Sequence, residues 1–301
     1  MSAALHRVAR TASPFDPDNA GGYRRWRDNK LAACPANVSA LMVEIGDPRA
    51  PSVAERGALL AALRRANLVV YACGIHAADP DIPRALGRQF GLTRLDRNFL
   101  ADDDGMSRVT VAGERARGEF IPYTNRPIGW HTDGYYNPPE RRIRAMLLHC
   151  DRRAAEGGEN TLLDHEIAYL LLRDEDPAFV HALMLPDALT IPAREDDDGI
   201  ARPAETGPVF SIEPESGALH MRYTARTKSI EWKRDSAVGA AVAALARVLA
   251  TPSPHHHRIA LEPGMGVLCN NVLHERTGFV DDVEAPRLLY RARYYDRVAG
   301  T

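Results

Sequence analysis

The stretch Trp130-His131-Thr132-Asp133-Gly134-Tyr135-Tyr136 places an imidazole and a carboxylate two residues apart. In an extended segment, residues i and i+2 point to the same side, so His131 and Asp133 can chelate one metal ion while Thr132 faces away. Such a pair of common residue types also recurs by chance, often as a hydrogen-bonding couple on the surface. The stretch therefore predicts a metal site only if the chain supplies a further ligand.

A third candidate ligand, His274, lies near the C-terminus in the sequence PGMGVLCNNVLHERTGF (263–279). Its Pro-Gly turn leads into a short apolar strand, and His274 comes just after the strand. Two imidazoles and one carboxylate on one face of a metal leave the remaining coordination positions free, as a redox-active iron that binds a cosubstrate and O2 requires. We therefore predict that His131, Asp133 and His274 are iron ligands.

A row of arginines follows in the sequence PRLLYRARYY (286–295), which has the pattern of a further strand. Strand alternation places Arg287, Leu289, Arg291 and Arg293 on one face and the intervening apolar and aromatic residues on the other. An arginine row on an inward face needs anionic partners. The alternative is a polar outer face whose arginines are solvated.

The order of the motifs HTD, GG-x-x-T, PG…N…H-x-R-T-x-F and R-x-x-x-R resembles the iron- and 2-oxoglutarate-dependent dioxygenases of the taurine dioxygenase superfamily. Within it, the γ-butyrobetaine hydroxylase-like and clavaminate synthase-like branches are the most similar. The resemblance extends from about Val53 to Tyr295, and four motifs in the same order are more specific than any one of them.

The resemblance implies Fe(II), the cosubstrate 2-oxoglutarate and O2 as the reacting partners of the three ligands. It implies that Arg287 binds the distal carboxylate of 2-oxoglutarate as a fork, a task that suits a planar, permanently charged guanidinium. It also implies that Thr161, in EGGENT (156–161), contacts the cosubstrate. Arg291 would contact either an acidic group of the substrate or the cosubstrate.

The implied reaction is oxidation, and above all hydroxylation, of an unactivated C–H bond of a small polar substrate, with release of succinate and CO2. An amino acid, a betaine or a related acid would fit. Asp133 argues against halogenation, because related halogenases have a small residue at that position. Desaturation or ring formation in a biosynthetic pathway, or a sulfonate dioxygenase, are alternatives. From other classes, a zinc hydrolase with the same triad and a non-catalytic binding module stay open.

Candidate substrate contacts are polar or aromatic residues expected near the ligands. Aromatic rings could cage a quaternary ammonium group, although aromatic residues on strands more often fill the core. The candidates are Asn125, Tyr135, Tyr136, Arg222, Arg226 and Arg291. The triplet His255-His256-His257 is interpreted instead as a solvated loop, because consecutive extended side chains alternate faces.

The composition is that of an enzyme without a polyanionic partner. Lys and Arg total 38 and Asp and Glu total 40, so we expect no nucleic-acid partner. No apolar run is long enough for a membrane span and no signal-peptide core is present, which predicts a cytoplasmic protein. The four cysteines lack C-x-x-C spacing, so we expect reduced thiols. A homo-oligomer, either a dimer or a tetramer, stays open.

The pattern along the chain predicts a mainly β protein with covering helices (α+β), built on a jelly-roll-like, cupin-like double-stranded β-helix. The two halves must converge on one metal, so we expect a single domain over residues 1–301, with an irregular lead-in (1–37) and a core over about 53–295. Helices are expected over 53–67, 80–91, 165–175, 177–185 and 235–250, with a short one within 23–32. Strands are expected at LVVYACG (68–74) and RAMLLHC (144–150).

Overall fold

The computed structural model describes residues 13–75, 79–96, 105–111, 120–196, 199–227 and 230–301. The chain divides into two compact units. The sheet unit comprises residues 35–133, 139–162 and 254–301, and the helical unit comprises residues 1–34, 134–138 and 163–253. The expected single domain over residues 1–301 stays a prediction.

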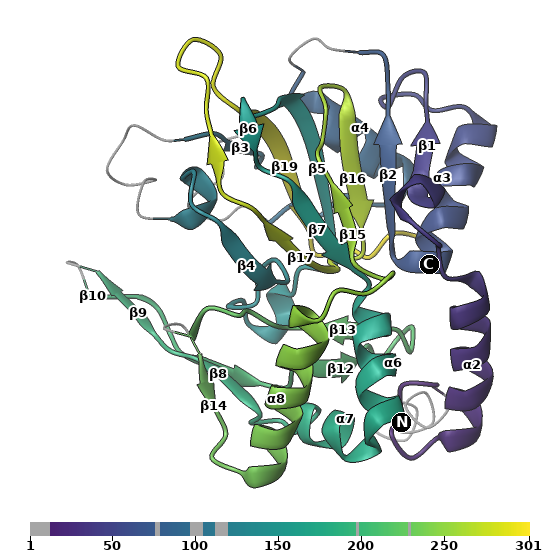
Figure 1. The fold of residues 1–301 in the computed structure, drawn as a ribbon, viewed down its shortest axis with the longest axis vertical. Helices are drawn as coiled ribbons and strands as arrows, with labels where there is room; N and C mark the ends of the chain where they lie inside the picture. Colours follow the sequence, from purple (N-terminus) through teal and green to yellow (C-terminus); the bar gives the residue numbers. More distant parts are fainter. Residues whose placement is uncertain (1–12, 76–78, 97–104, 112–119, 197–198, 228–229) are drawn as a thin grey trace. The chain divides into compact units, whose positions relative to one another are not determined.

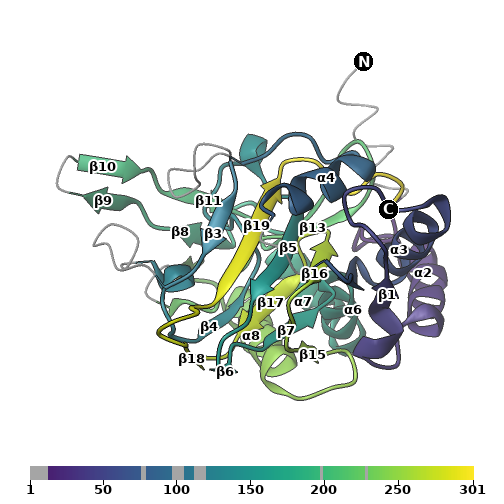
Figure 2. The same ribbon diagram turned by 90° about the horizontal axis from the view of Figure 1, so that it is seen from above.

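A six-stranded sheet forms the larger part of the sheet unit (Figures 1 and 2). The two strands at one edge are parallel, and the other neighbours are antiparallel. In spatial order the strands are β1 (Met42–Glu44), β2 (Leu68–Ala72), β16 (Met265–Cys269), β5 (Ala145–Arg152), β19 (Leu288–Tyr294) and β3 (Ser107–Val109).

A second sheet of the same unit has four strands, β15 (His257–Ile259), β7 (Asn160–Leu163), β17 (Leu273–Arg276) and β4 (Ile128–His131). The two sheets share one apolar cluster, in which Val267 and Leu289 of the larger sheet meet Leu162 and Ile259 of the smaller. Apolar burial between these faces therefore holds the sheets together. A short pair, β6 (Glu156–Gly157) with β18 (Phe279–Val280), extends beside them.

The other face of the six-stranded sheet is covered by two helices, α3 (Val53–Ala66) and α4 (Asp81–Gln89). Leu59, Leu63 and Leu86 of these helices share a cluster with Tyr71 and Leu147 of the sheet. Helix α3 begins with a capping box in which Ser52 and Glu55 satisfy each other's backbone N–H groups. Both helices were predicted, α3 from its apolar spacing and α4 from a start near Pro80-Asp81 and an end at Gly91, and both are confirmed.

Strand β19 alternates as the sequence predicted. Tyr290, Ala292 and Tyr294 belong to the cluster beneath the helices, whereas Leu289 belongs to the cluster between the sheets. Because Arg287, Arg291 and Arg293 share the face of Leu289, their side chains lie on the side of the smaller sheet. The solvated alternative for this arginine row is wrong for Arg287 and Arg293, which are buried.

The helical unit contains α2 (Ala20–Ala33), α6 (His165–Glu175), α7 (Pro177–Leu183) and α8 (Ser236–Ala250). The last three were predicted. Helix α2 is longer than the short helix expected in an irregular lead-in, because its Lys30 is buried in ion pairs with Asp164 and Glu166, both 2.6 Å away. Asp164 and Glu166 lie at the start of α6, and the sequence of the lead-in does not indicate that Lys30 pairs with them.

The strands of the helical unit are short. They are β8 (Leu189–Ile191), β9 (Arg194–Asp196), β10 (Gly199–Arg202), β11 (Glu205–Gly207), β12 (Phe210–Ile212), β13 (Leu219–Met221) and β14 (Glu231–Trp232). They form two-stranded and three-stranded sheets. The chain thus combines sheets with helices, as expected at that level. Among the described residues, no helix is both long and apolar enough to cross a membrane, and all four cysteines are free.

A close approach of two strands makes one glycine essential to the larger sheet. The Tyr71 hydroxyl and His149 Nδ1 lie 2.9 Å apart in the core, and the Tyr71 ring crosses Gly266 of the neighbouring strand. A Cβ at Gly266 would lie 2.3 Å from the Tyr71 ring and 2.4 Å from the Leu148 carbonyl oxygen. Neither backbone nor buried ring can yield at such a distance.

We therefore expect Gly266→Ala to lower the free energy of unfolding by about 1–3 kcal/mol or more through overpacking. The matched control is Gly239→Ala in α8, where an added Cβ has open space. That change should raise the free energy of unfolding by about 0.5–1 kcal/mol, because alanine favours the helix. Urea unfolding followed by circular dichroism measures both, and equal effects of the two changes would show that the strands have room for a Cβ at Gly266.

Candidate metal centre

The pairing of β4 with β17 brings two predicted ligands together. His131 is the register partner of His274, and their ring centroids are 4.1 Å apart. Asp133 follows two residues after His131, with its Oδ1 4.0 Å from His131 Nε2. One ligand atom from each of His131, Asp133 and His274 lies within 4.8 Å of the others. The structure thus gathers the three residues that the sequence singled out.

Each histidine is oriented by its own strand. His131 Nδ1 lies 3.0 Å from the Gly129 carbonyl oxygen, and His274 Nδ1 lies 2.9 Å from the Val272 carbonyl oxygen. A carbonyl oxygen only accepts, so each Nδ1 carries the proton and donates it. Each Nε2 is then left with its lone pair, which is the atom that a neutral imidazole offers to a metal.

Asn271 fixes the backbone at the carboxylate ligand. Its Oδ1 accepts from the Asp133 backbone N–H at 2.8 Å, and its Nδ2 donates to the carbonyl oxygens of Asp133 at 2.9 Å and Ile143 at 2.7 Å. Asn271 adopts a left-handed backbone with φ 52°, which asparagine tolerates better than most residues. The turn before β17 therefore clamps the segment that follows β4.

Charges at the centre favour the protonation states that a metal requires. Burial and the neighbouring His274 lower the pKa of His131 to about 3, and burial lowers the pKa of His274. Burial alone would raise the pKa of Asp133, but the guanidiniums of Arg291 and Arg293 outweigh it and hold that pKa below its usual value. Two neutral imidazoles and one ionised carboxylate result.

A small cavity, partly open to solvent, adjoins the two histidines of the triad. Arginine and amide groups line it beside the two histidines: Asn160, Arg276, Arg287 and Arg291. The buried Oδ2 of Asp133 and the buried Nδ2 of Asn160 have no hydrogen-bond partner among the described residues. Buried polar atoms without a partner are costly, so unused atoms of this kind are expected where a ligand binds. The donor set fits a divalent iron with an anionic molecule beside it.

The family described as taurine catabolism dioxygenase TauD, TfdA matches residues 31–293. The chain belongs to this family. The superfamily predicted from the four motifs is therefore confirmed. The match spans the ligand triad, the GG motif and the arginines up to Arg293.

Two curated relatives are similar in sequence. Uridine-5'-phosphate dioxygenase from Amycolatopsis sp is 34% identical over 55% of this chain and 60% of its own length. The protein of the same name from Streptomyces sp is 32% identical over 69% of this chain and 76% of its own length. Among solved structures, asparagine oxygenase with Fe(II), 2S,3S-3-hydroxyasparagine and succinate has a TM-score of 0.53 at 16% identity, covering 98% of this chain and 92% of that one. That likeness concerns the fold.

The GG motif of the family shapes the cavity wall. Gly157 and Gly158 have positive φ values of 73° and 74°. A Cβ at Gly157 would lie 2.4 Å from the Gly278 carbonyl oxygen, and one at Gly158 would lie 3.4 Å from Arg287 Nε. The two glycines therefore allow the chain before β7 to lie against β18 and Arg287.

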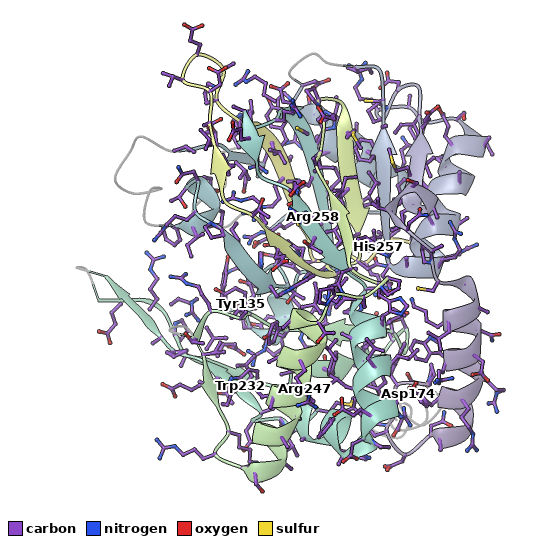
Figure 3. The ribbon with its side chains drawn as sticks, in the orientation of Figure 1. Tyr135, Asp174, Trp232, Arg247, His257 and Arg258 are labelled. Atoms are coloured by element: carbon purple, nitrogen blue, oxygen red, sulfur yellow. The ribbon has the colours of Figure 1, made fainter. Side chains whose placement is uncertain are left out.

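On β7, adjacent residues face opposite sides of the sheet. Asn160 lines the cavity together with His274, whereas the Thr161 hydroxyl is hydrogen-bonded to the Glu275 side chain. The strand partner of Thr161 is Arg258, an exposed residue that Figure 3 labels. Arg258 forms an ion pair with Glu159. The structure thus places Asn160, which the sequence motif did not single out, beside the triad. Thr161 as a cosubstrate contact stays a prediction.

The predicted arginines differ in how they are used. Arg287 is buried and its guanidinium lies 5.1 Å from the centre of the Phe279 ring, without a hydrogen bond to any described residue. Arg291 donates to Asp133 Oδ1 at 3.4 Å. Arg222 lies in the helical unit and donates to the carbonyl oxygens of Leu189, Glu205 and Gly207. Its side chain therefore supports the short strands, and its role as a substrate contact stays a prediction.

The remaining predicted substrate contacts stay predictions as well. Tyr135 and Tyr136 pack edge to face in the helical unit, 5.2 Å between ring centroids, with Arg202 over the Tyr136 ring (Figure 3 labels Tyr135). Arg226 of the same unit is exposed.

Asn125 is exposed in the sheet unit, on the loop before β4. Arg276 holds this loop by donating to the carbonyl oxygens of Thr124 at 2.8 Å and Arg126 at 2.6 Å. The expectation that His255-His256-His257 is a solvated loop is wrong for His257. That residue is buried at the start of β15, where strand pairing with Leu162 places it.

We expect Fe(II) added without O2 to raise the unfolding temperature of the protein, because a ligand that binds only the folded state stabilises it, by about 2.7 kcal/mol at 100 times Kd. His274→Ala should abolish this shift, and His255→Ala, a histidine outside the triad, should retain it. Differential scanning calorimetry with and without a chelator measures the shift. A His274→Ala protein that keeps the full shift would contradict the ligand assignment.

Proposed function

We propose that this protein is an Fe(II)- and 2-oxoglutarate-dependent dioxygenase with His131, Asp133 and His274 as the iron ligands. The observation that carries the proposal is the convergence of three ligand atoms within 4.8 Å, beside a cavity whose wall contains buried, unused hydrogen-bonding groups. The family to which the chain belongs supports it. A double-stranded β-helix, formed by the two packed sheets, is the corresponding proposal for the fold.

The residues of the centre have separate tasks. Bound iron would supply the activation of O2, coupled to the decarboxylation of 2-oxoglutarate to succinate and CO2. The two imidazoles would hold the ion through Nε2, and backbone carbonyls orient them. Asp133 contributes a negative charge that offsets part of the metal charge. Leu148, Leu289 and Met146 add apolar surface to the lining of the cavity, which limits the access of water.

The cosubstrate would take the unused donors. A 2-oxoglutarate carboxylate needs several N–H donors, and a guanidinium binds it best as a fork. Arg287 supplies that fork, because its guanidinium makes no hydrogen bond within the described part of the chain. Asn160 Nδ2 is a second buried donor on the same cavity. We therefore add Asn160 to the candidate cosubstrate contacts.

For the substrate, we propose a nucleoside 5'-phosphate. The two relatives described above both bear the name uridine-5'-phosphate dioxygenase, and each is more than 30% identical over the matched part. A phosphate monoester is also a small polar anion, the class that the arginines favour. The reaction would convert a C–H bond to C–OH, while 2-oxoglutarate and O2 become succinate and CO2. Amino acids, betaines and sulfonates are the alternatives to test.

Succinate release with a panel of substrates tests this function. With Fe(II), 2-oxoglutarate and O2, we expect uridine 5'-phosphate to stimulate succinate release well above the level without substrate. Uridine, which lacks the phosphate, is the matched control and should stimulate less. Stimulation by an amino acid, a betaine or a sulfonate would replace the nucleotide. Turnover with Zn(II) but without 2-oxoglutarate would indicate a hydrolase.

Three variants test the cosubstrate contacts. Arg287→Ala and Asn160→Ala should each raise the KM for 2-oxoglutarate by about tenfold or more, because a hydrogen bond to a charged group contributes about 1.5–3 kcal/mol. Thr161→Val, at the neighbour on the other face of β7, should raise this KM only if Thr161 also contacts the cosubstrate. If Thr161→Val raises the KM and Asn160→Ala does not, the motif-based assignment of Thr161 is right.

A further inference from the structure

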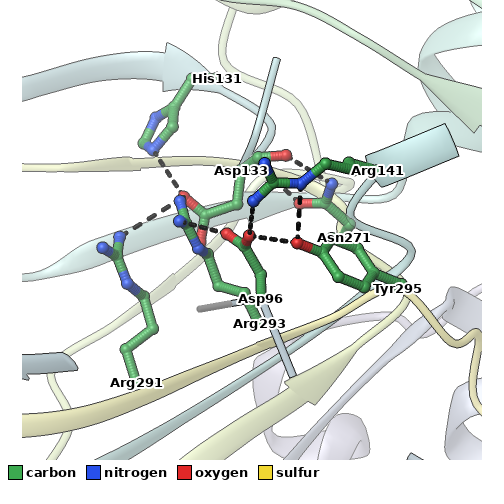
Figure 4. A network of polar contacts seen from close by, with 8 residues as sticks. All are labelled: Asp96, His131, Asp133, Arg141, Asn271, Arg291, Arg293 and Tyr295. Atoms are coloured by element: carbon green, nitrogen blue, oxygen red, sulfur yellow. Dashed lines mark hydrogen bonds and ion pairs between the residues drawn. The ribbon is translucent and has the colours of Figure 1, made fainter. Parts of the chain in front are cut away.

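A network of charges extends behind the carboxylate ligand (Figure 4). Arg293 Nη2 lies 2.5 Å from Asp96 Oδ2, and both side chains are at most 5% exposed. Asp96 Oδ1 also accepts from the Tyr295 hydroxyl at 2.6 Å and from Arg141 at 3.4 Å. Its backbone N–H donates to the Arg293 carbonyl oxygen at 2.8 Å. Asp96 is therefore held firmly against the end of β19.

Arg293 lies between two carboxylates and is much closer to one of them. Its Nη1 is 4.0 Å from Asp133 Oδ1, whereas hydrogen bonds of this type are about 2.7–3.2 Å long. A shift of roughly 1 Å would convert the longer contact into a hydrogen bond. The ion pair with Asp96, at 2.5 Å, keeps the Arg293 guanidinium away from Asp133.

The position of Arg293 affects metal binding because the two oxygens of Asp133 have only a limited number of lone pairs for a metal and for hydrogen-bond donors. Arg291 already donates to its Oδ1 at 3.4 Å. A second guanidinium in direct contact would occupy more of the carboxylate and would compete with a metal for its oxygens. Burying a guanidinium away from an anion is costly, so loss of the Asp96 charge would favour a closer contact of Arg293 with Asp133.

We propose that Asp96 is a positioning residue that restrains Arg293 and so keeps the Asp133 carboxylate available to the metal. The proposal rests on the proposed metal centre. Without the Asp96 charge, Arg293 would turn its guanidinium onto Asp133, and the metal would have to displace it. Asp96 thus acts on the centre through Arg293 and does not touch the ion.

Titration of the protein with Fe(II) alone, under exclusion of O2 and followed by calorimetry, tests the restraint. Asp96→Asn should weaken Fe(II) binding by about 10–100-fold, the range for partners of metal ligands. Arg293→Met should bind Fe(II) at least as tightly as the parent protein. The double variant Asp96→Asn/Arg293→Met should regain most of the lost affinity, because the competing guanidinium is gone.

Asp296→Asn is the matched control. Asp296 accepts from the backbone of Thr93 and Arg94, so it anchors the segment that leads to Asp96, and neither of these bonds involves Arg293. Its variant should keep the parent affinity. If Asp96→Asn fails to fold, Tyr295→Phe replaces it, since it removes one hydrogen bond to Asp96 and should weaken Fe(II) binding in the same direction by a smaller factor.

The outcomes separate the restraint from the metal centre itself. A parent protein that binds no Fe(II) would overturn the proposed function. A parent that binds Fe(II), with Asp96→Asn unchanged, would overturn the restraint alone. The restraint is also wrong if the double variant stays as weak as Asp96→Asn, or if Asp296→Asn loses as much affinity.

Discussion

The pairing of β4 with β17 is the contact on which the centre depends. It sets His131 opposite His274, and the short run after β4 then brings Asp133 to the same place. The segments are far apart in sequence, so the pairing must be fixed by the rest of the sheet unit. The apolar cluster between the two sheets does this, since it contains Leu162 of β7 and Val272 beside β17. Burial of ordinary aliphatic residues therefore determines where the polar ligands meet.

Around this point the chain concentrates charge in a place that would otherwise be apolar. Arg276, Arg287 and Arg293 are all buried, and the surroundings of each guanidinium are different. Arg276 donates to loop carbonyls, and Arg293 pairs with Asp96. The guanidinium of Arg287 makes no hydrogen bond to a described residue and lies over the Phe279 ring. A buried guanidinium without an anion is tolerated where a ligand completes it, which sets Arg287 apart from its neighbours.

Much of this could be predicted from the sequence, because local periodicity is strong. The alternation in β19 follows from the two-residue repeat of a strand, and the caps and apolar spacing of α3 and α8 mark their ends. Single-residue register and distant partners cannot be read from such local patterns. Thr161 and Asn160 are neighbours, and only the pairing of β7 decides which one faces the cavity. The sequence near Lys30 does not indicate the two carboxylates with which it pairs. In the same way, the sequence near Asp96 does not indicate that its partner is the guanidinium of Arg293.

The hydrogen bonds that orient the two histidine ligands have a consequence for mutation. Their acceptors are the main-chain carbonyls of Gly129 and Val272, two residues before each ligand. Every amino acid carries such a carbonyl, so a side-chain substitution at either position leaves the acceptor in place. Many metal-binding histidines instead rely on a carboxylate side chain, which one substitution can delete. The orientation of these imidazoles is thus set by the main chain of the two strands, and the hydrogen bond itself does not depend on which side chain stands at residue 129 or 272.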